Sequence, residues 1–120
     1  MHDPAEHGLV VKAICDGLGG CFERDERAVR RILDDPDMRG LTPRYLRRKV
    51  IEFVTARGGA VVRQVLETRD PWQADFKYYY KAILPEPGFK HGVFVEMVLS
   101  DDDDPELPEV TLVGAHPQRK

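Results

Sequence analysis

Two lysines enclose three consecutive tyrosines in one short run, Lys77–Lys81. Alternate residues of a β-strand point to the same face, so Lys77, Tyr79 and Lys81 share one face and the other two tyrosines lie on the opposite face. Ammonium groups beside an aromatic ring bind phosphates and allow nucleobases to stack. The alternative is a solvated face on which the lysines pair with glutamates of the next strand.

A single carboxylate, that of Glu96, interrupts the apolar run Phe94–Val98. A glutamate surrounded by apolar side chains is unfavourable unless it is paired. Such a carboxyl group suits general acid or base chemistry, and an ion pair with a lysine or arginine of a neighbouring strand explains it equally well. The sequence leaves both interpretations open.

Histidines and cysteines lack the spacing of familiar metal sites. His91 and His116 lie near the ends of predicted strands, and histidine is the side chain that exchanges a proton near neutral pH. Cys15 and Cys21 form no Cys-x-x-Cys pair and are too few for a disulfide framework. We therefore predict no metal and no cofactor, and we interpret the cysteines as small apolar residues.

Four consecutive aspartates, Asp101, Asp102, Asp103 and Asp104, lie between two predicted strands. They lack the alternating ligands, the central glycine and the final glutamate of a calcium-binding loop. Their mutual repulsion is relieved by solvent, by a cation or by a basic partner. The sequence favours a solvated loop, and a basic protein is the partner that this loop would attract.

Helical periodicity dominates the first half of the chain and strand patterns the second half. Caps, first-turn prolines and apolar spacing predict helices over 4–18, 23–34 and 43–57. Runs of β-branched and aromatic residues predict strands over 60–68, 76–84, 92–99 and 109–115. The connections after the second and third strands are too short for parallel crossovers, so the sheet is expected to be antiparallel. The predicted class is α+β, with two or three N-terminal helices packed on one face of a four-stranded sheet.

The order of these elements resembles the barnase and RelE-like family of small bacterial ribonucleases, many of which are toxins. The lysine and tyrosine cluster on a strand, the strand glutamate and a histidine directly after the last strand carry this resemblance, which covers roughly residues 23–120. It implies metal-free RNA cleavage, in which a base takes the proton of the ribose 2′-hydroxyl, cations stabilise the pentavalent phosphate and an acid protonates the leaving 5′-oxygen. The residues implied are Glu96 or Tyr79 as the base, His116 as the acid, and Lys77, Lys81 and Arg63 as the phosphate-binding cations.

Composition limits the other functions of the chain. With 120 residues, 42% of them hydrophobic, one domain over 1–120 is expected, with its first helix within 1–20, a helical part over 23–57 and a sheet over 60–116. The net charge of -3 does not indicate a polycation. No apolar run approaches the roughly 18 residues of a membrane span, and the first residues lack the basic charge of a signal peptide, so a cytoplasmic location is expected.

Two classes of function follow as hypotheses. The first is a small, toxin-like endoribonuclease that acts on RNA without a metal, through acid and base residues on the uncovered face of the sheet. The second is a non-enzymatic immunity or regulatory module that binds a basic protein through the acidic loop over 101–109. A small-molecule site on aromatic residues of the sheet is a third interpretation.

Overall fold

Helices occupy the first half of the chain and strands the second, as the sequence predicts. The computed structural model describes residues 3–18 and 22–119. Over these residues the α-helices and strands are α1 (Pro4–Cys15), α2 (Glu26–Asp34), α3 (Pro43–Arg57), β1 (Arg63–Leu66), β2 (Tyr78–Leu84), β3 (Val93–Asp101) and β4 (Glu109–Pro117). Short 3-10 helices cover η1 (Pro36–Met38), η2 (Gly59–Val61) and η3 (Trp72–Ala74).

Side-chain caps determine where the helices begin. Asp3, Asp25 and Thr42 each accept a hydrogen bond from a backbone N–H of the first helical turn, which satisfies a donor that has no partner inside the helix. Proline also occupies the first position of α1 and of α3, where its missing N–H costs nothing. The second helix therefore begins at Glu26, directly after its aspartate cap, rather than at position 23.

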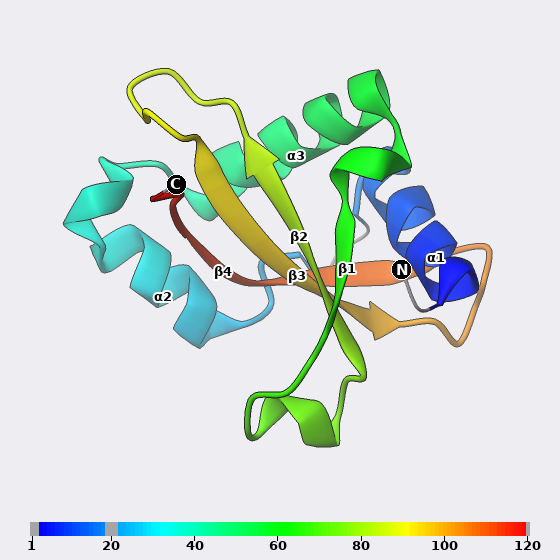
Figure 1. The fold of residues 1–120 in the computed structure, drawn as a ribbon. Helices are drawn as coiled ribbons and strands as arrows, with labels where there is room; N and C mark the ends of the chain where they lie inside the picture. Colours follow the sequence, from blue (N-terminus) through cyan, green and yellow to red (C-terminus); the bar gives the residue numbers. More distant parts are fainter. Residues whose placement is uncertain (1–2, 19–21, 120) are drawn as a thin grey trace.

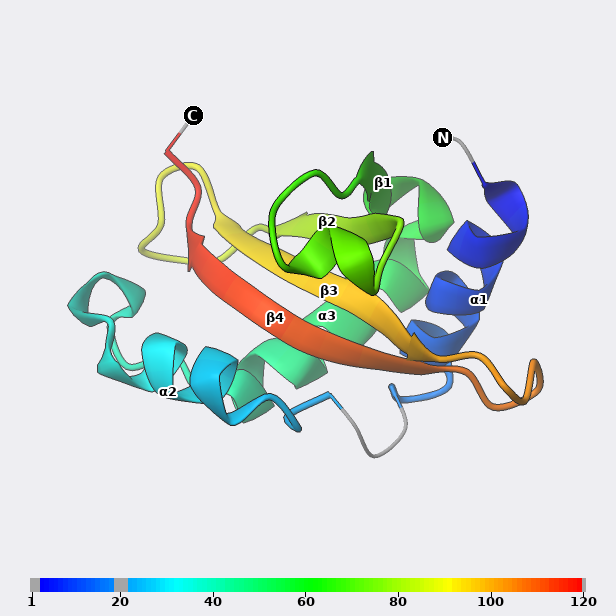
Figure 2. The same ribbon diagram turned by 90° about the horizontal axis from the view of Figure 1, so that it is seen from below.

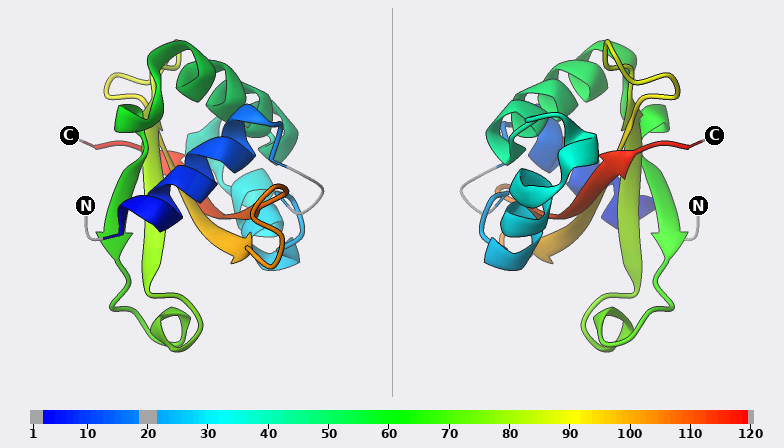
Figure 3. Two further views of the ribbon diagram at one scale, coloured as in Figure 1. Left: turned by 90° about the vertical axis from the view of Figure 1, so that its right-hand side faces the viewer. Right: turned by 90° about the vertical axis from the view of Figure 1, so that its left-hand side faces the viewer.

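The strands form one antiparallel sheet in the order β1-β2-β3-β4, so each strand pairs with its neighbour in the sequence. The hairpin between β2 and β3 closes at Gly92, which has a φ of +83° and where a Cβ would collide with the carbonyl oxygen of Leu84, leaving no room for a side chain. The helices lie together on one side of this sheet (Figure 3), and α1 and α2 stand at opposite ends of it (Figure 2). This arrangement confirms the predicted α+β class and the antiparallel pairing.

A continuous apolar core lies between the helices and the sheet. Val10 and Ile14 of α1 and Val50 of α3 are fully buried there, against Tyr80 and Val95 of the strands. Tyr80 belongs to the tyrosine face that the sequence predicts on the side opposite Lys81, and alternation along β2 is correspondingly clear. The face of the sheet that carries Lys81 is therefore the one turned away from the helices.

Three element boundaries differ from the predicted ones in ways that affect the site. The first strand is shorter, because residues 59–61 form a 3-10 turn. The second begins at Tyr78, so Lys77 lies just before β2 rather than within it. The last strand continues to Pro117, so His116 belongs to β4 instead of following it. At each of these strand ends, backbone pairing with the neighbouring strand is gained or lost. Such pairing depends on the neighbouring strand more than on the local sequence pattern.

Candidate active site on the open sheet face

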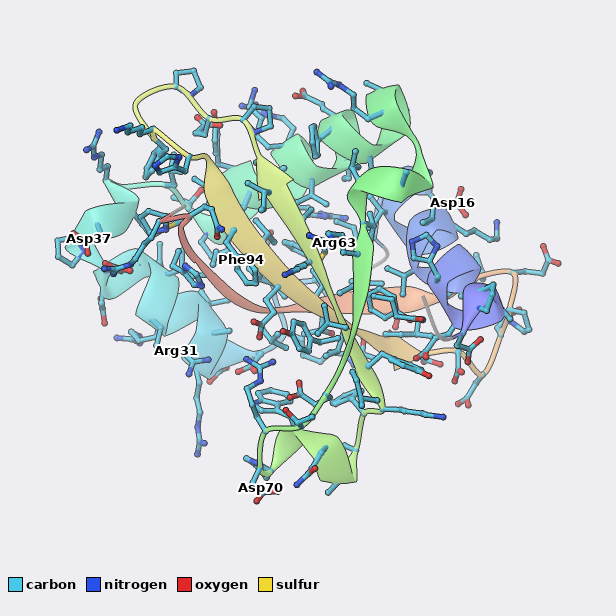
Figure 4. All side chains as sticks on the ribbon, viewed as in Figure 1. Asp16, Arg31, Asp37, Arg63, Asp70 and Phe94 are labelled. Atoms are coloured by element: carbon cyan, nitrogen blue, oxygen red, sulfur yellow. The ribbon has the colours of Figure 1, made fainter. Side chains whose placement is uncertain are left out.

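The strand register lines up four positions across the sheet. Arg63 pairs with Lys81, Lys81 with Glu96, and Glu96 with Gly114. Side chains at directly paired positions point to the same face, so this row crosses the face turned away from the helices. We call that face the open face; Figure 1 views it from the front, with α3 behind the sheet, and Figure 4 shows Arg63 there.

The Glu96 carboxylate is held by an arginine from outside the strands. Arg69, in the segment between β1 and β2, directs two nitrogens of its guanidinium to Glu96 at 2.9 and 3.2 Å. The same guanidinium makes two bonds of 2.8 Å to Glu67, whose side chain is 1% exposed. This double bridge raises the pKa of Arg69 above its ordinary value, and the arginine lowers the pKa of Glu67.

Tyr79 lies under the same guanidinium. The Arg69 guanidinium carbon is 4.5 Å from the centre of the Tyr79 ring, within the range of a cation–π contact. Burial, followed by the negative charge of Glu96, raises the pKa of Tyr79. The phenol therefore keeps its proton at neutral pH, where it can donate a hydrogen bond.

His116 sits one row away from Glu96, on the strand next to it. Its pairing partner is Phe94, and the two rings are stacked with centroids 4.7 Å apart and an interplanar angle of 14°. The Lys81 ammonium lies 5.8 Å from the centre of the same Phe94 ring. The imidazole is exposed, and stacking on Phe94 restrains its orientation without covering it.

Glu96 and His116 line one hollow of about 340 Å³, which we call the catalytic hollow after the base and acid roles predicted for these two residues. Its walls are Arg31 and Asp35 from the α2 side and Arg69 and Trp72 from the segment between β1 and β2, and the backbone of β4 contributes its floor. In Figure 4 Arg31 projects from α2 beside the sheet. Elements that are far apart in the sequence thus surround a carboxylate, an imidazole and two guanidinium groups.

A bulge and a glycine open the floor of this hollow. Between Glu96 and Met97 the register changes, so that β4 carries one extra residue, Val113, whose carbonyl accepts a bond of 3.2 Å from Arg31. The next residue, Gly114, stands directly opposite Glu96, and no atom lies within 4 Å of the position that a side chain would take there. The missing side chain leaves space beside the carboxylate.

The predicted site residues are only partly brought together. Glu96 and His116 share the hollow, and Lys81 stands beside Glu96 in the row that also contains Arg63. Tyr79 lies beneath Arg69. Lys77 is separate from this group, because it precedes β2 and its ammonium lies over the Tyr78 ring at 5.5 Å.

The acidic loop lies at the other end of the β3–β4 hairpin. Asp101 pairs with Glu109, seven residues along β3 from the pair that includes His116, a separation of roughly 23 Å at about 3.3 Å per residue. Figure 1 shows this connection beside α1, at the end of the sheet away from α2. Asp101 and Asp104 each accept a bond from a backbone N–H two residues on, so both carboxylates are engaged in the turn.

Metal ligands do not gather anywhere in the described residues, which contain no group of three or more histidines, cysteines, aspartates or glutamates suited to a metal ion. Cys15 is exposed, and Cys21 lies outside the described residues. His91 is in the β2–β3 connection, away from the catalytic hollow. In ranges 3–18 and 22–119 no helix has the length and apolar character needed to cross a membrane.

Arg69, Trp72 and Arg31 are site residues that sequence reasoning missed. A carboxylate in an apolar strand signals that a cation lies nearby, but that signal does not say which cation. Arg69 and Trp72 come from an irregular segment, where periodicity does not predict the direction in which a side chain points.

Comparisons of the chain with protein-family models, with curated proteins and with solved structures found no match. The side chains of the open face are therefore the basis for assigning a function.

Proposed function

We propose that this protein is a metal-independent endoribonuclease whose active site is the catalytic hollow. The observation that carries this proposal is that Glu96 and His116 line the same hollow. Attack of a ribose hydroxyl on the neighbouring phosphodiester needs a base, an acid and cations that stabilise the charged phosphate. A carboxylate and an imidazole on one concave surface, with cations beside them, supply these groups.

The chemistry assigns one proton transfer to each of these two groups. Glu96 accepts the proton of the ribose 2′-hydroxyl, and the 2′-oxygen attacks the adjacent phosphorus. The bond from phosphorus to the 5′-oxygen breaks, and His116, in its imidazolium form, protonates that oxygen. The products are a 2′,3′-cyclic phosphate and a free 5′-hydroxyl, and the enzyme ends with one proton more on Glu96 and one fewer on His116.

Cations beside Glu96 stabilise the charge that builds up on the phosphate. The Arg69 guanidinium bonds the carboxylate directly, Lys81 is paired with Glu96 on β2 and has its ammonium over the Phe94 ring, and the Tyr79 hydroxyl is a further donor on the same face. Once Glu96 accepts a proton, its attraction for Arg69 falls, so the guanidinium becomes available to the phosphate oxygens as they gain charge. The ion pair thus positions Glu96 before the reaction, and during the reaction Arg69 stabilises the transition state.

The net charge of -3 does not oppose this proposal, because the aspartates are remote from the hollow. Asp101 lies five residues along β3 from Glu96 and seven from the pair that includes His116, separations of roughly 17 and 23 Å at about 3.3 Å per residue. These separations are about two and about three screening lengths of about 8 Å at physiological salt. The charges nearest to RNA in the hollow are therefore those of Arg31, Arg69 and Lys81 and of the carboxylates Asp35 and Glu96, rather than those of the loop.

The test is incubation of the purified protein with total RNA in the presence of EDTA, with His116→Ala and Glu96→Gln beside the wild type. We expect fragments that end in a 2′,3′-cyclic phosphate, and a loss of cleavage of about 100-fold or more in each variant. His91→Ala is the matched control, because it removes an exposed histidine outside the hollow. Intact RNA with the wild type, or full cleavage by both variants, would overturn the proposal.

One observation favours the second candidate function, a module that binds a basic protein. Leu107 is 71% exposed within the loop that carries the aspartates, so a basic partner that pairs with the acids would also bury this apolar side chain. Replacing Asp101, Asp102, Asp103 and Asp104 with serine, together with Leu107→Ser, would abolish such binding. Intact RNA in the first test, with capture of a basic protein lost in this variant, would favour the module.

A further inference from the structure

A separate hollow of about 490 Å³ opens between α3 and the β2–β3 connection. Its walls come from the second half of α3, the end of β2 and the connection itself. Because β1 begins at Arg63, opposite Lys81, the last residues of β2 extend past the neighbouring strand. The hollow lies at this end of β2, where Figure 1 shows α3 passing behind the strands. We call it the hairpin hollow; a different set of residues lines the catalytic hollow.

Apolar side chains form most of the walls of the hairpin hollow. The rings of Phe53 and Phe89 line it and are half-buried, beside the buried Leu84. Ile83 also lines it and is 36% exposed, although it is a large apolar residue. The volume falls within the range of about 300–1,000 Å³ that small-molecule sites occupy. A ligand with an apolar body would remove the exposed part of Ile83 and of both rings from water.

Positive charge predominates among the groups of this hollow that remain available to a ligand. Arg57 and Lys90 line it and are exposed, and within residues 3–18 and 22–119 neither belongs to an ion pair. One carboxylate, that of Glu86, lines the hollow as well. It accepts a hydrogen bond of 2.6 Å from the Tyr45 hydroxyl of α3, so it is already engaged. The hollow therefore suits a ligand that carries a negative charge on an apolar body.

The two rings and the guanidinium favour a flat ligand over a flexible one. The Arg57 guanidinium lies 5.8 Å from the centre of the Phe53 ring, a contact that restrains it before a ligand arrives. A restrained guanidinium loses less entropy on binding, and its parallel N–H groups match the two oxygens of a carboxylate. Aromatic rings gain from stacked or edge-to-face contacts with one another, and a rigid ring system has few rotatable bonds to immobilise.

We propose that the hairpin hollow binds an aromatic carboxylic acid. The ring system of the ligand packs against Phe53, Phe89 and Ile83, and its carboxylate lies beside Arg57 and Lys90. This binding activity goes beyond the proposed ribonuclease function and does not depend on it, because the two hollows have different lining residues.

The experiment is a titration of the purified protein with three probes, followed by the backbone amide signals in ¹H–¹⁵N NMR spectra. We expect 2-naphthoate to bind with a dissociation constant on the order of 0.1 mM, which is typical of a ligand of its size. The amide 2-naphthamide, which keeps the rings without the charge, should bind about tenfold more weakly. Decanoate, which keeps the charge without the rings, should bind about fivefold more weakly. The largest shifts should occur at residues 83–92.

Variants at exposed positions separate the charged contacts from the apolar ones. Replacing both cations, with Arg57→Gln and Lys90→Gln in one protein, should remove the preference for 2-naphthoate over 2-naphthamide. Ile83→Ser should weaken both probes by about fivefold and leave that preference intact. Arg30→Gln is the matched control, because it removes an exposed arginine of α2, away from the hairpin hollow. It should leave all three affinities unchanged.

Three outcomes would overturn the site: equal binding of 2-naphthoate and 2-naphthamide by the wild type, a preference that survives in the variant without both cations, or shifts centred outside residues 83–92. Decanoate bound as tightly as 2-naphthoate would overturn the aromatic class of the ligand. RNA cleavage by the same preparation is measured separately. Loss of either activity in the wild type therefore contradicts one proposal without deciding the other.

Discussion

Arg69 organises the carboxylates of the open face. It bridges Glu67, which is buried, and Glu96, which is at the hollow, and it covers the Tyr79 ring. A buried carboxylate without a cation is unfavourable, so Glu67 keeps Arg69 in position even when Glu96 changes its protonation state. Glu67, which lies outside the hollow, thereby preserves the geometry of the groups within it.

Stability should depend on pH through Glu67. Its folded pKa lies below the ordinary value of 4.5, so its contribution to stability is present above that value and is lost as the pH falls through the folded pKa. We expect Glu67→Gln to lower the free energy of unfolding by about 2 kcal/mol at pH 7, a modest figure because Arg69 is half exposed. The difference from wild type should shrink below about pH 4.

Urea unfolding at pH 7 and at pH 3 measures this difference. Glu52→Gln is the control, because that glutamate forms an exposed pair with Lys49 on α3 and should change stability by well under 1 kcal/mol at either pH. A Glu67→Gln difference that stays the same at both pH values would refute the role given to this pair.

Tyr79 provides a test between the two bases implied by the resemblance. Because burial and Glu96 raise the pKa of this phenol, it is protonated wherever the enzyme is expected to work. Tyr79→Phe should therefore reduce kcat/KM by only about three- to tenfold, the loss of one hydrogen bond. The pH–rate profile should keep its shape. Complete loss of cleavage with a normal fold would instead assign Tyr79 an essential role.

At the scale of elements, the register between β3 and β4 creates the catalytic hollow. The bulge at Val113 directs one carbonyl to Arg31 and leaves Gly114 facing Glu96. A regular ladder with a larger residue at this position would bring a side chain against the carboxylate and fill the space. The segment between β1 and β2, with η3 at its centre, then closes the hollow with Arg69 and Trp72.

Filling that space should separate cleavage from folding. A side chain at Gly114 meets nothing within 4 Å, and valine is favoured over glycine in a strand, so Gly114→Val should fold with stability within about 1 kcal/mol of wild type. Cleavage should fall by about 100-fold, with Gly114→Ala in between. Thermal unfolding and an RNA cleavage assay measure the two properties, and full activity in Gly114→Val would show that the substrate does not use this floor.

At the scale of the whole molecule, charge is distributed to opposite ends. Acids occupy the β3–β4 connection, which lies beside α1 in Figure 1, whereas Arg31 and Arg69 line the catalytic hollow next to α2 together with Asp35 and Glu96. Because screening limits each region to its own surroundings, the aspartates contribute little to the electrostatic potential at these arginines.

Removing the acidic charges should have little effect on cleavage. With Asp101, Asp102, Asp103 and Asp104 replaced by serine, we expect kcat/KM for RNA within about twofold of wild type at physiological salt, since the loop is about two screening lengths from Glu96 and farther from His116. The rates at low and at physiological salt are the measurement. A rise of tenfold or more at physiological salt would mean that the loop approaches the RNA.

Local patterns in the sequence determine the helices, the strands and the buried face of the sheet. Caps such as Thr42 specify where a helix starts, and strict alternation along β2 specifies which tyrosines are buried, because both depend on residues close together in the chain. Short connections then require antiparallel neighbours. For the same reason the α+β class and the position of Lys81 and Glu96 on strands could be predicted from the sequence.

Only the tertiary structure decides which groups meet. The register brings Lys81, Glu96 and Gly114 into one row, and a slip of one residue would have turned Glu96 toward the helices. Arg69, the cation that pairs with Glu96, comes from a segment without periodicity. Strand register and loop direction depend on contacts between residues that are distant in the chain, and the local spacing of residue types does not predict those contacts.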